Sequence, residues 1–158
     1  MTVHIVPALL ADIPEVTRLV EALLCEIMEK IGEAAFQLET AHAMSCLKKA
    51  LSMQKTRAWL AQEASTQQAV GVILVSESFA VYAGGIFGTI TELYVQPAYR
   101  KYGIGKQLID TVRLFGQQQQ WKRLEATSPP LPEFADTVKF YQREGFGITG
   151  GRKLKVLL

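Results

Sequence analysis

The sequence predicts an α/β fold, with one mixed and mostly antiparallel sheet flanked by helices. Its 158 residues are enough for one domain with its own core, so a single domain over residues 1–158 is expected. Two patterns lead to this class. Short β-branched and apolar runs alternate along the chain with segments whose apolar residues recur at helical spacing, and Gly103 and Gly105 lie in a turn between a strand-like and a helix-like run.

The first elements are a strand over residues 3–6 and a long helix. Asp12 is expected to cap this helix, with Pro14 in the first turn and Glu15 completing a capping box, and Gly32 is expected to end it. Its apolar stripe faces the core and consists of Val16, Leu19, Val20, Leu23, Leu24, Ile27 and Met28.

The middle of the chain combines a second helix with the main sheet strands. The helix is expected over residues 40–53. Antiparallel strands are expected at 58–62 and 69–76, joined by the polar turn 65–68, and a further strand at 87–95.

The last third is expected to contain a helix, a strand, a second helix and a closing strand. The first helix covers 106–117, and the strand covers 122–127. The second helix places Phe134 and Tyr141 on one face. Alternating apolar residues at 153–158 predict a strand that closes the sheet.

Charge is distributed unevenly along the chain. Residues 1–95 carry 6 basic and 10 acidic side chains, whereas residues 96–158 carry 11 basic and 5 acidic ones. The second half therefore suits an anionic ligand. Its basic residues are scattered and accompany no nucleic-acid-binding motif, so no nucleic-acid partner is expected.

Several classes of protein are disfavoured by composition. The longest aliphatic run, residues 70–75, is too short to span a bilayer, and no signal peptide is visible, so a cytoplasmic protein without a membrane partner is expected. Cys25 and Cys46 are read as reduced, buried thiols, with a disulfide as the alternative. No Cys, His and carboxylate spacing resembles a metal site, so no metal is expected.

The turn Arg-Lys-Tyr-Gly-Ile-Gly at residues 100–105 is the most informative stretch. The first amides of a helix have no internal partner and carry partial positive charge, which favours a bound phosphate. Gly103 and Gly105 let a pyrophosphate approach the backbone, and Arg100, Lys101 and Lys106 add countercharge. The alternative is a basic turn followed by an ordinary amphipathic helix.

Two common phosphate motifs do not fit this turn. The dinucleotide fingerprint G-x-G-x-x-G requires glycine where Leu108 stands. A P-loop requires Ser or Thr after its lysine, and Gln107 occupies that position.

R-x-x-G-x-G, preceded by Glu-Leu-Tyr-Val-Gln-Pro, resembles the acetyl-CoA motif of the GCN5-related N-acetyltransferases. Residues 140–146, Phe-Tyr-Gln-Arg-Glu-Gly-Phe, resemble the terminal helix of the same family. The element order agrees over the whole chain, and the residue motifs cover 88–146. The resemblance implies acetyl-CoA as cosubstrate. Its implied contacts are Leu93, Tyr94, Val95, Arg100, Lys101, Tyr102, Gly103, Ile104, Gly105 and Lys106.

Glu92 is the candidate catalytic base. It stands in an otherwise apolar or uncharged strand, where alternation places Ile90, Glu92 and Tyr94 on one face. Apolar neighbours raise a carboxyl pKa toward a useful range. The alternatives are a surface glutamate or a partner for an arginine. The family also implies a splayed strand, with free amides near Tyr94 and Val95 that hold the thioester oxygen.

Tyr141 is the candidate acid, because a phenol is protonated at neutral pH and can donate to a departing thiolate. The alternative is a core aromatic. The family often has asparagine where Phe134 stands, and that residue contacts the pantetheine arm. A phenyl ring can pack on pantetheine but cannot donate to its amides.

The resemblance implies an N-acetyltransferase that moves acetyl from acetyl-CoA to a primary amine of a small molecule or peptide by direct attack in a ternary complex. A non-catalytic acyl-CoA-binding regulatory module of the same fold is the alternative. Relatives are commonly homodimers. The first predicted helix and its exit are acidic, which suggests a small cationic amine as acceptor or a solvated helix face. The acidic residues are Glu21, Glu26, Glu29, Glu33 and Glu39.

Overall fold

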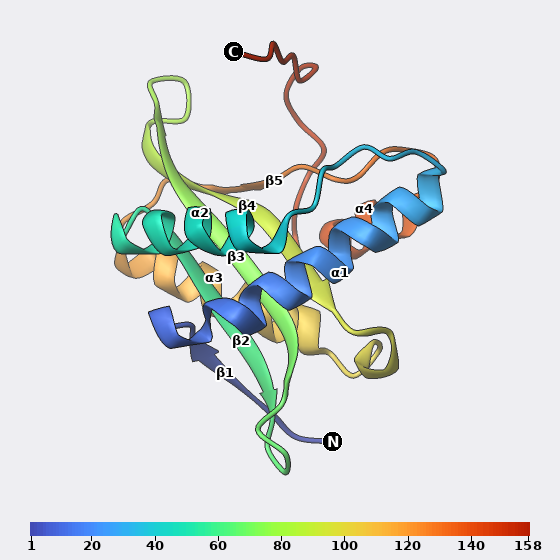
Figure 1. Ribbon diagram of the computed structural model, residues 1–158. Coiled ribbons are helices and arrows are strands. Elements are labelled where there is room, and N and C mark those ends of the chain that lie inside the picture. Colours follow the sequence, from blue (N-terminus) through green and yellow to red (C-terminus); the bar gives the residue numbers. More distant parts are fainter. The chain divides into compact units, whose positions relative to one another are not determined.

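The computed structural model describes residues 1–158, and the chain forms two compact units, residues 1–127 and residues 128–158 (Figure 1). The first unit contains all the strands and three of the four α-helices, and the second contains α4. The elements are β1 (Val3–Pro7), α1 (Ile13–Ile31), α2 (Thr40–Ser52), β2 (Thr56–Glu63), β3 (Ala69–Ala80), β4 (Gly85–Val95), α3 (Ile104–Gln118), β5 (Leu124–Ala126) and α4 (Ala135–Arg143). Short 3₁₀ turns, Leu10–Asp12 and Pro97–Tyr99, precede α1 and follow β4.

The five strands form one sheet in the order β1-β2-β3-β4-β5. The first four are antiparallel to their neighbours, and only β4 and β5 run parallel. The α/β class and the mostly antiparallel sheet are therefore confirmed. The predicted strand at 122–127 is shorter than expected, because only Leu124–Ala126 pair with β4.

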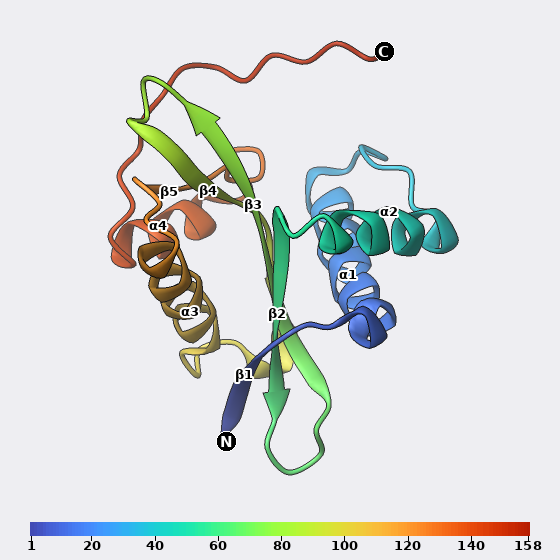
Figure 2. The same ribbon diagram turned by 90° about the vertical axis from the view of Figure 1, so that its left-hand side faces the viewer.

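Helices cover both faces of this sheet: α1 and α2 lie on one side and α3 on the other (Figure 2). On the first face Leu19 of α1 packs in a buried cluster with Leu60 and Val72 of the sheet. On the second face Trp59 meets the Phe115 ring of α3 edge-on at 5.2 Å between centroids. Burial of one such aliphatic side chain contributes about 1.5–3 kcal/mol to the free energy of folding. These two packed layers hold α1 and α3 against the sheet that carries β4.

A β-bulge in β4 changes which residues share a face. Leu74 pairs with Glu92, whereas the next residue, Val75, pairs with Ile90, so Thr91 is an extra residue. Directly paired residues share a face, and neighbours on a regular strand do not. Ile90 and Glu92 therefore lie on opposite faces, and the prediction that they share one was wrong because it assumed a regular strand. The predicted shared face of Glu92 and Tyr94 is confirmed. Glu92 lies on the face of α1.

The start of α1 also differs from the prediction. The Asp12 carboxylate accepts the Leu9 N–H at 2.8 Å and makes no cap bond to the α1 backbone. Glu15 accepts from Arg18 at 2.8 Å, so the expected capping box is absent. The carboxylate is recruited by the 3₁₀ turn that leads into α1. The helix ends at Gly32 with φ 72°, as predicted.

The predicted closing strand at 153–158 is wrong. These residues form no strand, and all of them are exposed. Alternation indicates a strand only where a partner edge is available, and none pairs with this segment. The prediction of buried thiols is also wrong: Cys25 and Cys46 are free, as expected, but both are exposed.

The second unit is built around α4 (Ala135–Arg143), and Phe134 is the residue that precedes it. The Tyr141 ring packs edge-on against Phe140 at 5.5 Å and against Phe146 at 5.2 Å between centroids. The Phe146 N–H donates to the Tyr141 carbonyl at 3.0 Å. In the whole chain, no helix combines the length and apolar character needed to cross a bilayer.

Candidate functional site

The pairing of β4 stops partway along the strand on one side. The β4–β5 ladder runs from Gly88↔Leu124 to Ile90↔Ala126 and ends there, whereas the β3–β4 ladder continues to Val95. From Thr91 onward the β5-facing side of β4 thus has no strand partner. Because β5 ends at Ala126, ladder groups of β4 beyond Ile90 are available to a ligand, and the splay that the resemblance implied stays a prediction.

Glu92 lies on this half-paired part of β4. Burial raises the pKa of its carboxyl group, and a smaller opposing effect comes from the hydrogen bond that the Thr91 hydroxyl donates to it. The bulge makes this contact between sequence neighbours possible, because it interrupts the alternation that would separate them. A raised pKa makes Glu92 a stronger base than an ordinary carboxylate.

The segment after β4 presents a row of unpaired backbone donors. The N–H groups of residues 101–105 donate to no other backbone group, and the first helical bond of α3 runs from Gln107 N to Gly103 O at 3.0 Å. Lys101 and Gly103 have φ of 69° and 76°, and Gly103 is the N-cap residue of α3. Left-handed residues at a helix start turn successive N–H groups outward, which creates an anion-binding site.

Arg100 is fixed at the surface by contacts with α1 and β4, although its side chain remains partly exposed. Its Nη1 and Nη2 donate to Glu26 of α1 at 3.0 and 2.6 Å, and its Nε donates to the Val95 carbonyl at 2.8 Å. The guanidinium also lies over the Tyr94 ring, 5.5 Å from its centroid. The bond to Glu26 raises the pKa of Arg100. Arg100 therefore anchors the loop to α1, whereas the sequence suggested only a countercharge.

The other predicted loop residues differ in exposure. Ile104 is buried, and Lys101, Tyr102 and Gly103 are exposed. Lys106 donates to Asp110 of α3 at 2.5 Å. The exposed backbone at 101–103 is therefore the most accessible part of the loop.

The strand residues of the predicted cofactor site point in two directions. Tyr94 pairs with Val72 and lies on the α1 face, where it is 7% exposed. Burial raises the pKa of its phenol, and Glu26 adds to that increase. Leu93 and Val95 pair with Ile73 and Gly71 on the opposite face. The Tyr94 side chain thus belongs to the core, whereas Leu93 and Val95 are half-buried, and the backbone of all three residues faces the unpaired side of β4.

The predicted site residues fall into two groups. Glu92, the end of β4 and residues 100–106 all lie in the first unit, where Arg100 links the loop to the Val95 carbonyl at the end of β4. Phe134 and Tyr141 lie on the α4 segment of the second unit. Phe134 is buried, and burial raises the pKa of Tyr141 to about 12. That phenol stays protonated throughout the neutral range.

Sequence reasoning missed two residues that shape the site. Glu26 pairs with Arg100, from which it is separated by 74 positions in the sequence, and no local sequence pattern predicts such a pair. Thr91 creates the bulge and contacts Glu92, although an exposed threonine in a strand gives no warning of either role. Only the three-dimensional register and packing of β4 reveal these contacts.

The Arg100–Glu26 pair gives a first prediction about stability. Glu26→Gln should lower the free energy of unfolding by about 1 kcal/mol at low salt, because a bidentate pair of partly exposed groups loses its charge assistance. Denaturant unfolding at two salt concentrations measures this loss, which should shrink at high salt. Glu29→Gln, on an exposed part of the same helix, is the control and should change stability little. An equal effect of both variants would mean that Glu26 does not anchor the loop.

A comparison with known protein families identifies the family to which the chain belongs. The family model described as an acetyltransferase (GNAT) domain matches residues 54–148, which is more than half of the sequence. The chain therefore belongs to the GCN5-related N-acetyltransferase family. No match was found among curated proteins. No group of three or more His, Cys, Asp or Glu side chains is arranged to hold a metal ion.

Solved structures support the same fold. An integron cassette protein from a salt-marsh metagenome at Cole Harbour matches 98% of this chain and 90% of its own, with 24% identity and a TM-score of 0.79. A ribosomal-protein-alanine N-acetyltransferase from Brucella melitensis matches 99% and 100% of the two chains, with 20% identity and a TM-score of 0.77. A predicted acetyltransferase from Clostridium acetobutylicum, solved with acetyl-CoA, matches 99% and 96%, with 17% identity and a TM-score of 0.78. At these identities the likeness concerns the fold.

Proposed function

We propose that this protein transfers acetyl from acetyl-CoA to a primary amine of a small molecule or peptide, by direct attack in a ternary complex. The observation that most supports this proposal is the row of unpaired backbone N–H groups at residues 101–105, which follows the half-paired end of β4. Such a row suits a pyrophosphate. Family membership and the related fold solved with acetyl-CoA support the choice of cosubstrate.

In this proposal the amine nitrogen attacks the thioester carbon, the carbon–sulfur bond breaks, and CoA leaves as a thiolate. Glu92 takes the proton that the amine loses, directly or through water, and its raised pKa favours that role. Backbone N–H groups near Tyr94 and Val95 stabilise the negative charge on the carbonyl oxygen. Tyr141 donates to the departing sulfur.

Further proposals concern the extent of the domain, the localisation and oligomeric state of the protein, and the contact with the pantetheine arm. We take residues 1–158 as one N-acetyltransferase domain of a cytoplasmic protein, able to form a homodimer. Phe134 packs its ring against the pantetheine arm, in place of the amide contact made in relatives. The raised pKa of Glu92 favours an enzyme over a non-catalytic acyl-CoA-binding module. A screen of amines and peptides for thiol release distinguishes the two, because a binding module releases no CoA above the background rate.

The loop gives the test of cofactor binding. Gly103→Glu should weaken acetyl-CoA binding more than tenfold in calorimetry, because it places a carboxylate beside the N–H groups that receive the pyrophosphate. Any side chain is strained at φ 76°, so Gly103→Gln is the matched control for size and strain. The charged variant should bind more weakly than the neutral one. Wild-type affinity in a folded Gly103→Glu protein would remove this assignment of the loop.

A further inference from the structure

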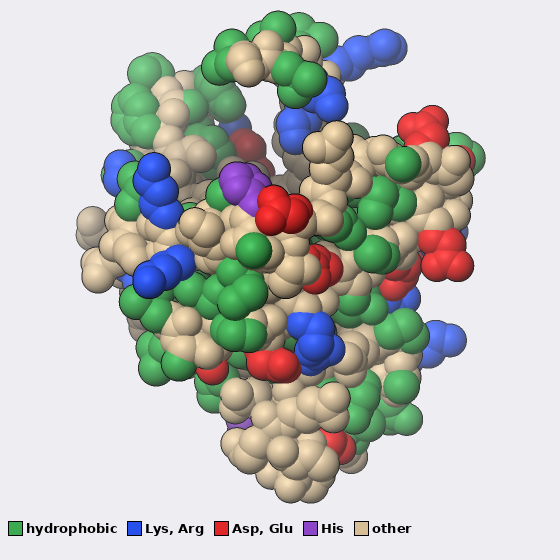
Figure 3. All heavy atoms as spheres, in the orientation of Figure 1, with side chains coloured by type: hydrophobic (Ala, Val, Ile, Leu, Met, Phe, Trp, Pro, Cys, Tyr) green, Lys and Arg blue, Asp and Glu red, His purple; other side chains and the backbone are tan.

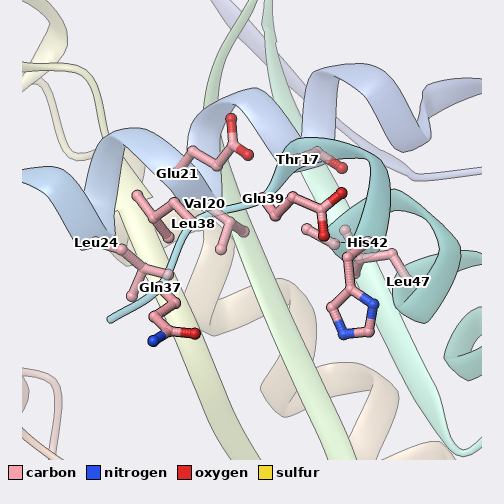
Figure 4. Close-up of a pocket in the computed structure, with 10 residues that line it drawn as sticks. Thr17, Val20, Glu21, Leu24, Gln37, Leu38, Glu39, His42 and Leu47 are labelled. Atoms are coloured by element: carbon pink, nitrogen blue, oxygen red, sulfur yellow. The ribbon is translucent and has the colours of Figure 1, made fainter. Parts of the chain in front are cut away.

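A cavity lies between α1 and α2, within the first unit (Figure 4). It has a volume of about 130 Å³ and is lined by α1, by the segment that precedes α2 and by α2 itself. No residue of β4 or of the loop 96–106 lines it. Cavities of ~150 Å³ hold ligands about the size of benzene. This one has room for a small organic molecule.

The lining residues of α1 form their own stripe. Thr17, Glu21 and Leu24 follow at intervals of four and three residues, so they share one side of the helix. The residues that reach the buried sheet cluster, Val16 and Leu19, lie on another side. Val20 and Leu47 line the cavity and also pack against this cluster, so the cavity lies next to the layer that α1 makes with the sheet.

The walls of the cavity combine apolar side chains with two carboxylates. Leu24, Leu38 and Leu47 supply apolar surface from the three lining segments. Glu21 and Glu39 supply negative charge, and no lysine or arginine lines the cavity. Figure 3 shows acidic, basic and hydrophobic side chains on this side of the molecule, although no basic one belongs to the cavity lining. A ligand that complements both the carboxylates and the apolar walls is a cation with an apolar body.

Both carboxylates retain bonding capacity. Glu39 precedes α2, but its side chain makes no capping bond to the helix and no ion pair. Glu21 accepts the Thr40 hydroxyl on Oε1 at 2.7 Å, while Oε2 makes no hydrogen bond within the protein. A protonated amine carries three donors and can bond more than one such acceptor.

Thr17 supplies an independent indication of a ligand. It is 2% exposed, it lines the cavity, and its hydroxyl is the one buried side-chain polar atom without a hydrogen-bond partner. In Figure 4 this oxygen projects from α1 toward α2. Buried polar groups almost always have a partner, so an unpaired hydroxyl beside a cavity indicates that something else completes it.

We propose that the α1–α2 cavity binds a small alkylammonium ion, at a site separate from the acetyl-transfer site. The apolar body of the ligand packs on the leucines, and its ammonium group lies near Glu21, Glu39 and the Thr17 hydroxyl. Glu21 and Glu39, which the sequence connected with a cationic acceptor, line this cavity, whereas Glu92, Tyr141 and residues 100–106 do not. The proposal therefore does not depend on acetyl transfer.

Titration of the full chain, ¹⁵N-labelled, with n-butylammonium chloride tests the site by NMR. Saturable shifts should appear at amides of residues 17–24 and 37–47, beyond those produced by sodium chloride at the same ionic strength. Neutral 1-butanol should bind at least fivefold more weakly, because it lacks the charge that the carboxylates favour. Equal binding of the two, or no saturable shift in the cavity, refutes the proposal.

Three variants assign the contacts. Glu39→Gln should lower n-butylammonium affinity at least fivefold, whereas Glu29→Gln, which removes the same charge from α1 outside the cavity, should change it less than twofold. Thr17→Val should lower the affinity and raise the melting temperature, because it removes an unpaired buried hydroxyl. Equal losses in both glutamate variants contradict the site. Glu92→Gln should bind n-butylammonium normally, and loss of binding there would place the amine at the transfer site instead.

Discussion

Glu92→Gln should lower kcat by ~10²–10⁴-fold while leaving acetyl-CoA affinity within twofold of the wild-type value. The amide keeps the shape of the side chain but cannot accept the amine proton. Steady-state turnover with saturating amine and calorimetric titration of acetyl-CoA measure the two quantities. Glu29→Gln, which removes an exposed carboxylate of α1, should keep full turnover.

The pH dependence separates a base from a merely structural carboxylate. A general base works only when deprotonated, so wild-type kcat should fall on the acid side as Glu92 becomes protonated. Burial raises the pKa of Glu92 above its ordinary value of 4.5, and this fall should therefore begin at a higher pH than for an ordinary glutamate. In Glu92→Gln the acid limb should flatten. Wild-type turnover with an unchanged limb would leave Glu92 a structural role.

The same raised pKa affects stability. The folded protein binds the Glu92 proton more tightly than the unfolded chain, whose value is near 4.5. This contribution is fully present below that pH and is lost as the pH rises through the folded pKa. Glu92→Gln has no such titration. The difference in unfolding free energy should therefore shift in favour of the variant between pH 4 and pH 8, as measured by denaturant unfolding at both values.

The sequence predicted the parts of the fold that depend on local periodicity. The stripe of α1, its end at Gly32, and the antiparallel strands β2 and β3 follow from spacing and turn residues alone. The closing strand at 153–158 failed because pairing depends on a partner edge elsewhere in the chain. The Asp12 cap failed for a local reason, since the preceding turn competes for the same carboxylate.

The candidate site likewise combines features that the local sequence predicts with features that depend on distant parts of the chain. The glycine turn is a short contiguous motif, so its strand–turn–helix setting was predictable. The facing of Glu92 depends on one inserted residue, Thr91, because a bulge reverses every later side chain. The pairing of Arg100 with Glu26 joins distant segments, and neither residue type nor spacing specifies it. The charge composition predicted a basic half of the chain. It could not predict which basic side chains form ion pairs within the protein.

Tyr141→Phe should lower kcat by ~10–10²-fold, because a hydrogen bond to a charged group is worth about 1.5–3 kcal/mol. A phenol with an ordinary pKa near ~10 would titrate in the basic limb of the profile. Burial moves the pKa of Tyr141 to about 12, well above the ~8.5 of an ordinary thiol. Complete proton transfer to the thiolate would be uphill by roughly 5 kcal/mol, so in the proposed mechanism Tyr141 would donate a hydrogen bond to sulfur and keep its proton.

This mechanism predicts a distinct pattern for Tyr141→Phe. The basic limb of the kcat profile should be unchanged below pH 10, because the phenol does not ionise there. The melting temperature should also change little, since the ring contacts to Phe140 and Phe146 remain. Turnover and thermal unfolding of one preparation, with KM for the amine as a further readout, test all three statements. A lower melting temperature with full turnover would make Tyr141 a packing residue, because a hydroxyl that stabilises the departing thiolate contributes to the rate and not to the core.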